Sequence, residues 1–405
     1  MFNTLKRDLE LDTPESNVRW AEPLTESFAN KDRIYTMDQD LLDQQKQLEE
    51  WRNSFTIQLA KQIQRTKGNS KYSMAVFCSG GCLDTLAGIR AGFKAVWSTE
   101  INSRQAKMFE DLTRGKCLGD AFGSAVSRAD RVTYIKSGQP CPDYTSSASK
   151  LGAQGETGWM FVKQVDILTE LEPWAICLEN TNNATSINDG DEVNAVVNAL
   201  EEAYVVYVRS IQVWRQGDPS NRTRLFIIAL HKDLGQAAHE FTWPADVYNE
   251  ATAPIARLIA VPDAEVPEKY WRYDKIKERY VWQNQGFHKI QVISRKGVGM
   301  GHSDNPHSIQ SWEGLLNGPT TLGGGGRRVE LDWNSGQPIS RTRMATPVEY
   351  CRAASQCDDY LKWCASYNTK DTDKFILLCL NNGVPMRTSV AVDLEVMKVL
   401  TKAEH

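Results

Sequence analysis

The sequence lacks a long apolar run, which argues against a membrane protein. No stretch of about 18 consecutive apolar residues occurs in the 405-residue chain, so no transmembrane helix is expected. The first residues, MFNTLKRDLELDTPESN, contain no apolar signal region. We therefore expect an intracellular protein, in the cytoplasm or nucleoid if prokaryotic or viral and in the nucleus if eukaryotic.

Cysteine pairs and a surplus of positive charge are also missing. The nine cysteines are an odd number and include no Cys-x-x-Cys pair, so we expect free thiols in a reducing compartment and no metal site. The net charge of −4 does not indicate a nucleic-acid binder. Between Val205 and Ala345, however, 18 Lys and Arg stand against 14 Asp and Glu. Such a local surplus suits phosphate contact, although chance drift in surface charge explains it equally well.

Short apolar runs alternate with helical patterns over residues 71–235. Runs such as SMAVF, VTYIKSG and PWAICLEN predict strands, and LDTLAGIRAGF and TGWMFVKQVDILTELE predict helices between them. This alternation is typical of right-handed βαβ units around a mostly parallel sheet. The sequence therefore predicts an α/β core.

The remaining segments have different patterns. Residues 1–70 form a polar extension, in which Asp38 to Thr66 predicts one long helix with an apolar stripe. We expect this helix to pack against the core, with binding of a partner as the alternative. Residues 236–341 are rich in Trp, Tyr, His, Gly and Asn and predict an irregular second domain. Helical patterns return over 342–405 and predict a C-terminal segment that rejoins the core.

Glycines and carboxylates follow three successive strands of the predicted sheet. Gly80 and Gly81 form a turn after the first strand, where glycine lets the backbone approach a ligand. Glu100 follows the second strand and Asp120 the third. Ligands of such sheets bind at the carboxyl ends of the strands. Each carboxylate alone is more readily a solvated side chain, but the three features together predict a cofactor that contains a nucleoside.

A thiol, a carboxyl and two guanidinium groups belong to the same edge of the sheet. Cys141 lies between two prolines in a polar loop after the fourth strand, which is poor context for a core cysteine. Glu179 follows the apolar run WAICL, where a carboxylate needs a partner or a task. Arg222 and Arg224 alternate onto one face just before LFIIAL. This set suits attack by a thiolate on an electron-poor ring that the carboxyl holds.

The order of these motifs resembles that of the DNA (cytosine-5) methyltransferase family. Outside the second domain, the matching segments lie between about Met74 and Leu400 and read VFCSGG, AVWSTEIN, LGDAF, QPCPDY, LENT, NRTRLFIIA, RTRMATPVEYCRAA and LNNGVPMRTSVAV. The resemblance implies a Rossmann-like core that binds S-adenosylmethionine and acts on double-stranded DNA. It places residues 236–341 where the family has its target-recognition domain. We expect a monomer.

The resemblance also implies roles for individual residues. Cys141 would add to C6 of a cytosine flipped out of the duplex, Glu179 would contact the base at N3 and at its amine, and Arg224 would hold the base or the Cys141 loop with support from Arg222. The methyl group would pass to C5, and β-elimination would free the thiol. The implied cofactor contacts are Phe77, Ser79, Gly80, Gly81, Glu100, Ile101, Asp120, Ala121, Pro140, Met160, Asn382 and Val384.

The sequence departs from the family pattern at supporting positions. Ser79 and Cys82 replace glycines in the first turn, and Pro142 stands beside Cys141 where the family carries glutamine. Three functions therefore stay open. They are methylation of cytosine in DNA, methylation of cytosine in RNA such as tRNA, and a catalytically silent relative that binds DNA or a partner as a scaffold. Retention of Cys141, Glu179 and Arg224 together opposes the silent relative, and methylation of DNA is the function that we expect.

Overall fold

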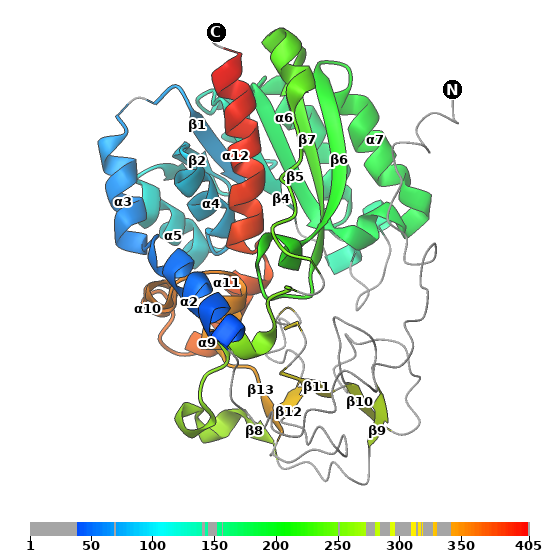
Figure 1. Ribbon diagram of the computed structural model, residues 1–405. Helices are drawn as coiled ribbons and strands as arrows, with labels where there is room; N and C mark the ends of the chain where they lie inside the picture. The colour runs from blue at the N-terminus through cyan, green and yellow to red at the C-terminus, as the bar shows by residue number, and fades with distance from the viewer. Residues whose placement is uncertain are drawn as a thin grey trace.

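The protein consists of an α/β core with a second, smaller sheet below it (Figure 1). The computed structural model describes residues 39–68, 70–139, 142–144, 152–155, 157–249, 252–272 and 342–403, with short segments at 280–283, 292–295, 309–312, 315–316, 318 and 327–329. The eight cysteines among these residues are all free thiols.

Seven strands form the central sheet in the order β3-β2-β1-β4-β5-β7-β6. Their bounds are β1 Ser73–Phe77, β2 Lys94–Ser98, β3 Lys116–Cys117, β4 Tyr134–Gly138, β5 Ala175–Thr181, β6 Tyr204–Gln212 and β7 Thr223–His231. Strands β1 to β5 pair in parallel, whereas β7 is antiparallel to both of its neighbours. The predicted α/β fold with a mostly parallel sheet is confirmed.

Helices cover both faces of the sheet. Helices α4 (Leu83–Ala91), α5 (Ser103–Thr113) and α12 (Met386–Lys402) pack on one face, and α6 (Trp159–Glu170) and α7 (Asp191–Leu200) on the other. Side chains of β5 alternate between these layers with the period of two that a strand imposes. Ala175 and Cys177 join the cluster of α4 and α12, while Ile176 and Leu178 join that of α6 and α7.

One stretch of the chain is long and apolar enough to resemble a membrane span. It runs from Thr372 to Lys402 and includes α12, but 72% of its most apolar window is buried inside the protein. Burial of this extent is typical of the core helix of a water-soluble fold.

The described part of the N-terminal extension, residues 39–68, forms two helices, so the prediction of one long helix from Asp38 to Thr66 was wrong. Helix α2 spans Gln39–Asn53 and α3 spans Ile57–Thr66. Thr56 caps α3 by accepting a hydrogen bond from the amide of Leu59, and the amide of Ile57 donates to Asp359. Phe55 between the helices is only 6% exposed and joins the core. Phe55 belongs to the apolar stripe that the sequence shows, and it stays buried at the break. As expected, the described part of the extension packs against the core.

A second sheet of six strands lies beyond the core, in the order β8-β13-β12-β11-β10-β9. The strands are β8 Trp271–Arg272, β9 Tyr280–Gln283, β10 Val292–Arg295, β11 Ile309–Ser311, β12 Arg327–Val329 and β13 Thr342–Met344. Each strand has four residues or fewer, so the sequence contains no alternating run that would reveal it. The irregular segment predicted over 236–341 thus contributes β8 to β12 to this sheet, and β13 belongs to the predicted C-terminal segment. The domain bounds stay a prediction.

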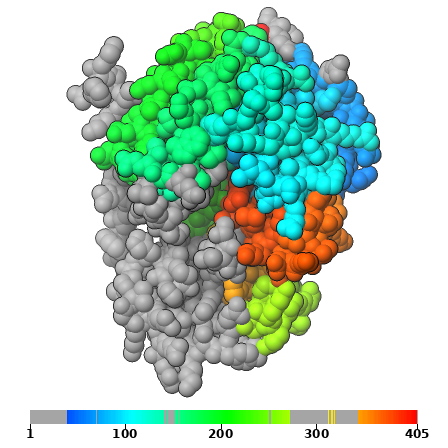
Figure 2. All heavy atoms as spheres, turned by 180° about the vertical axis from the view of Figure 1, so that it is seen from behind, coloured from blue at the N-terminus to red at the C-terminus, as the bar shows by residue number. Residues whose placement is uncertain are grey.

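Four helices end the chain and connect the two sheets. They are α9 (Pro347–Ala353), α10 (Asp358–Ala365), α11 (Thr372–Asn381) and α12. Figure 2 shows the orange surface of the C-terminal helices between the cyan core and the yellow-green residues near 260. Helix α12 returns to the central sheet, as the sequence predicts for the C-terminal segment.

Candidate active site

The candidate site lies at the carboxyl ends of β1 and β4, where the strand order changes direction. From β1 the chain proceeds outward through β2 and β3, and from β4 it proceeds the other way through β5. A crevice forms at such a switch point because the two connections leave on opposite sides of the sheet. Strand β7 is antiparallel to β5, so its first residues lie at this same edge. This topology explains how Arg224 reaches Glu179.

The turn after β1 has an unusual backbone. Cys78, Gly80 and Cys82 all have positive φ angles, of 55°, 48° and 63°. Gly81 has no room for a side chain, because an added Cβ would lie 2.5 Å from the Cβ of Cys379. Cys82, which replaces a family glycine, therefore holds a conformation that L-residues rarely adopt. The turn keeps the shape of a glycine turn despite the altered sequence.

Ser79, the other replacement, places a hydroxyl in the turn. Its side chain is 5% exposed, and its Oγ has no hydrogen-bond partner among the described residues. A buried hydroxyl without a partner costs free energy, so a ligand that supplies one would be stabilised here.

Glu100 connects the first two strand ends. One carboxylate oxygen accepts a hydrogen bond from the amide of Gly80 at 2.8 Å, and the other accepts one from the amide of Asn102, also at 2.8 Å. A carboxylate oxygen has a second lone pair, so both oxygens can still accept hydrogen bonds from a ligand. Gly80 also lies beside Asn382, whose Cβ would be 3.9 Å from an added Cβ. The structure therefore brings Gly80, Glu100 and Asn382 together, as the sequence predicts.

Exposed apolar side chains surround this group. Ile101 is 83% exposed although it is large and aliphatic. Phe122 follows Asp120 and Ala121, and its ring packs 4.8 Å from the ring of Trp159, which precedes Met160. Sequence reasoning missed this aromatic pair, because it joins two segments that are far apart along the chain. Trp159 is 42% exposed, so the pair leaves apolar surface for a flat ligand.

Three other predicted residues have more restricted roles. The side chains of Phe77 and Val384 are fully buried in the core, so only their backbones can reach a ligand. Asp120 uses one oxygen to accept a hydrogen bond from the amide of Phe122 at 3.0 Å. Its second oxygen is available to a ligand, because an Asp carboxylate can accept more than one bond.

Glu179 and Arg224 form an ion pair at the same edge. Arg224 Nε lies 2.9 Å from Glu179 Oε1, and the two side chains are 14% and 12% exposed. Burial raises the pKa of Glu179, against the opposing effect of the Arg224 charge. A carboxyl in this state binds a proton more readily than an exposed glutamate does.

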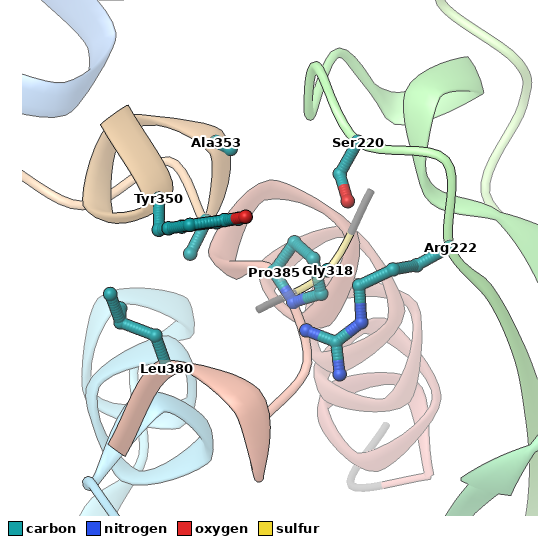
Figure 3. A pocket seen from close by; sticks show the side chains of 8 residues that line it. Ser220, Arg222, Gly318, Tyr350, Ala353, Leu380 and Pro385 are labelled. Atoms are coloured by element: carbon teal, nitrogen blue, oxygen red, sulfur yellow. The ribbon is translucent and has the colours of Figure 1, made fainter. Parts of the chain in front are cut away.

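Arg222 is placed differently from Arg224. It is 8% exposed and donates a hydrogen bond from Nη2 to the carbonyl oxygen of Asn381 at 3.0 Å. It also lines a small pocket between the start of β7 and the C-terminal helices, together with Tyr350 and Pro385 (Figure 3). Arg222 thus joins the sheet edge to α11, while its charge still acts on Glu179.

Cys141 and Pro140 lie outside the described residues, but the residues on either side of them are anchored. Gln139 donates from its side-chain amide to Gln164 Oε1 at 3.1 Å. Asp143 accepts hydrogen bonds from the amides of Thr157 and Gly158 at 2.8 and 2.9 Å. These contacts fix the end of β4 on one side and tie Asp143 to the start of α6 on the other.

Comparison with known proteins identifies the family of this chain. The family model of the C-5 cytosine-specific DNA methylases matches residues 74–353. The chain belongs to this family. Among curated relatives it is 28% identical over 213 residues to the type II methyltransferase M.DsaV of Dactylococcopsis salina, covering 52% of this chain and 57% of the relative. It is 25% identical over 181 residues to M.FnuDI of Fusobacterium nucleatum, covering 42% of this chain and 50% of the relative. The chain thus spans about half the length of these relatives.

The C-5 cytosine-specific DNA methylase fold also appears in solved structures. The Entamoeba histolytica methyltransferase EhMeth aligns with a TM-score of 0.58 over 83% of this chain and its own full length, at 14% identity. Such low identity supports the fold alone. Use of S-adenosylmethionine is implied by the family.

Proposed function

We propose that the protein transfers a methyl group from S-adenosylmethionine to C5 of cytosine in double-stranded DNA. The observation that carries this proposal is the buried Glu179–Arg224 ion pair at the switch point of the sheet, in a chain that belongs to the cytosine-specific family.

The residues around the first two strand ends suit this cofactor. Glu100 would accept hydrogen bonds from the ribose hydroxyls, and the exposed Ile101 would lie against the adenine. The unpartnered Ser79 hydroxyl and the turn at Gly80 and Gly81 would face the methionine part. Asn382 would close the site from the C-terminal side. Asp120, Ala121, Pro140, Met160, Phe77 and Val384 complete the proposed contacts.

S-adenosylmethionine supplies an electrophilic methyl group, and the chain must make the ring carbon nucleophilic. We propose that the Cys141 thiolate forms a bond to C6 of a flipped-out cytosine, which pushes an electron pair toward C5 and N3. Glu179 stabilises this charge by sharing its proton with N3 and accepting from the exocyclic amine. Loss of the C5 proton after methylation returns an electron pair that expels the thiolate.

Arg224 holds Glu179 in place during these steps. Its Nε lies closest to Glu179 Oε1, which leaves Oε2 to face the base. The second arginine, Arg222, contributes positive charge and ties this edge to α11. We propose that Arg224 orients the carboxyl and that Arg222 supports the region.

Methyl transfer from labelled cofactor to duplex DNA and to tRNA tests the proposal. We expect transfer to DNA that is lost in Cys141→Ser and reduced at least about a hundredfold in Glu179→Gln, the usual size of a general-acid contribution. Cys357→Ser is the matched control, since that thiol donates to the carbonyl of Phe55 at 3.7 Å and a hydroxyl can make the same bond. Transfer to tRNA alone, or no transfer by the wild type to either, would replace the DNA proposal with one of the other two functions.

A further inference from the structure

A buried cluster of charged side chains lies directly beneath the proposed active site. Lys136 on β4 is 3% exposed. Its ammonium group donates hydrogen bonds to Asp393 Oδ2 at 2.8 Å and to Ser389 Oγ at 2.7 Å. Asp84 Oδ1 lies 3.2 Å from the same nitrogen. The cluster therefore joins the central sheet to α12 through Asp393 and Ser389 and to α4 through Asp84.

Further hydrogen bonds complete this cluster. Tyr134 donates to Asp393 Oδ1 at 2.7 Å, and Ser389 donates to Asp84 Oδ1 at 2.9 Å. The bond from Ser389 and the ion pair with Lys136 both involve Asp84 Oδ1. The orientation of the Asp84 carboxylate is thus fixed through one oxygen, and the other oxygen is directed elsewhere.

The second oxygen of Asp84 faces Glu179 across Gly138. Gly138 pairs with Glu179 in the register of β4 and β5. A Cβ added to Gly138 would lie 3.7 Å from Glu179 Oε2 and 3.8 Å from Asp84 Oδ2. The two carboxylates therefore flank the same glycine, and the oxygen of Glu179 involved is Oε2, whereas Arg224 Nε pairs with Oε1.

Four charged groups act on Glu179 from the elements around it. Arg224 and Arg222 approach from β7 and the loop before it, Lys136 from β4 and Asp84 from α4. The three cations favour the ionised carboxylate, whereas Asp84 opposes it. Burial also opposes ionisation and is the largest influence on the pKa of Glu179. Asp84 is the anion among the four charged groups that act most strongly on this carboxyl.

Burying these charged groups costs free energy, which argues for a role beyond packing. Ionised groups lose several kcal/mol of hydration each when they are buried, and well-packed apolar side chains often replace such groups without loss of stability. Here the charges lie next to the carboxyl that the proposed reaction uses. We propose that Asp84, held by Lys136 and Ser389, is a positioning residue that fixes the proton affinity and orientation of Glu179 for methyl transfer.

The inference rests on the proposed function, but its main test does not require methyl transfer. The midpoint of Glu179 titration can be measured on the full chain by infrared difference spectroscopy of the protonated carboxyl band, with Glu179→Gln as the blank. Asp84→Asn removes an anion and should lower the midpoint. The double variant Lys136→Met, Asp393→Asn removes a cation together with its nearest anion, so the net buried charge is unchanged. It should raise the midpoint of Glu179, because Lys136 favours the ionised carboxylate.

Opposite shifts in these two variants are the expected result, since a purely structural cluster would not move the midpoint in opposite directions. Asp166→Asn on α6 is the control, because that carboxylate is 70% exposed, lies on the other side of the sheet and should leave the midpoint unchanged. If methyl transfer occurs, the limb of its pH profile that belongs to Glu179 should move in the same direction as the midpoint. Unchanged midpoints, or shifts of one sign, would overturn the inference even if the wild type is active. An inactive wild type with opposite shifts would instead overturn the proposed function alone.

Discussion

Replacing Arg343 with methionine should strongly destabilise the contact between the second sheet and the C-terminal helices. Arg343 lies on β13 and is 2% exposed, and Glu349 on α9 is fully buried. Two guanidinium nitrogens bind the two carboxylate oxygens at 2.8 and 2.9 Å. The same guanidinium also donates to Asp263 at 2.9 Å and to the carbonyl of Val261 at 3.1 Å. One side chain thus ties β13 to two other segments.

The size of the effect follows from the burial of Glu349. Removing one partner of a buried pair leaves an uncompensated charge and typically costs about 3–5 kcal/mol. Glu349 keeps hydrogen bonds from the amides of Val261 and Thr346 at 2.8 and 2.7 Å, so Arg343→Met should fall near the lower end of that range. Adding Glu349→Gln removes the stranded charge and should restore about 1–2 kcal/mol, since groups in direct contact couple by about 0.5–3 kcal/mol.

Urea unfolding monitored by tryptophan fluorescence measures this change. Trp312 is a local reporter, because the Arg343 guanidinium lies 4.3 Å from the centre of its ring. Arg352→Met is the matched control, since its partner Asp358 is 53% exposed and such pairs contribute about 0–1 kcal/mol. A loss in Arg343→Met no larger than that of the control, or no recovery in the double variant, would refute the reasoning.

Three further predictions concern the site and its cluster. Glu100→Ala should weaken S-adenosylmethionine binding roughly ten- to a hundredfold in calorimetry, because hydrogen bonds to a charged group contribute about 1.5–3 kcal/mol. An unchanged affinity with an intact fold would remove Glu100 from the site. DNA containing 5-fluorocytosine should form a covalent adduct with the wild type in the presence of cofactor, and an undiminished adduct with Cys141→Ser would exclude that thiol as the nucleophile. Burial raises the pKa of Asp393 from 3.8 to about 6. Between these two pH values the folded chain therefore binds more protons than the unfolded chain. The contribution of Asp393 to the free energy of unfolding is lost as pH rises through about 6. The free energy of unfolding of the wild type should therefore fall relative to that of Asp393→Asn across this window, and parallel curves would contradict the assignment.

The central sheet and the main site residues could be predicted from the sequence because they depend on local patterns. Most of its strands are apolar runs, and the topology of a parallel sheet brings the strand ends together without further information. Gly80 and Glu100 follow β1 and β2, and Glu179 lies near the end of β5, so their common edge was foreseeable. The Arg224 contact also followed, because an arginine at the start of a neighbouring strand can reach the carboxyl.

The features that were missed depend on contacts between distant segments. The break between α2 and α3 is supported by a hydrogen bond from Ile57 to Asp359, which no local pattern contains. Lys136 appears in the sequence as an ordinary charged residue of a strand, and only the return of α12 reveals its partner Asp393. The ring contact of Phe122 with Trp159 arises in the same way. The strands of the second sheet are too short for their period to show.

Bisulfite sequencing of DNA from a methylation-free host that expresses this chain tests the central claim most directly. The account predicts protected cytosines within one recurring sequence context in cells with the wild type, and none in cells with Cys141→Ser at equal protein level. The same sequencing data also identify the recognised DNA motif. Fully converted DNA from cells that contain folded, soluble wild-type protein would contradict the claim that the chain methylates cytosine in DNA.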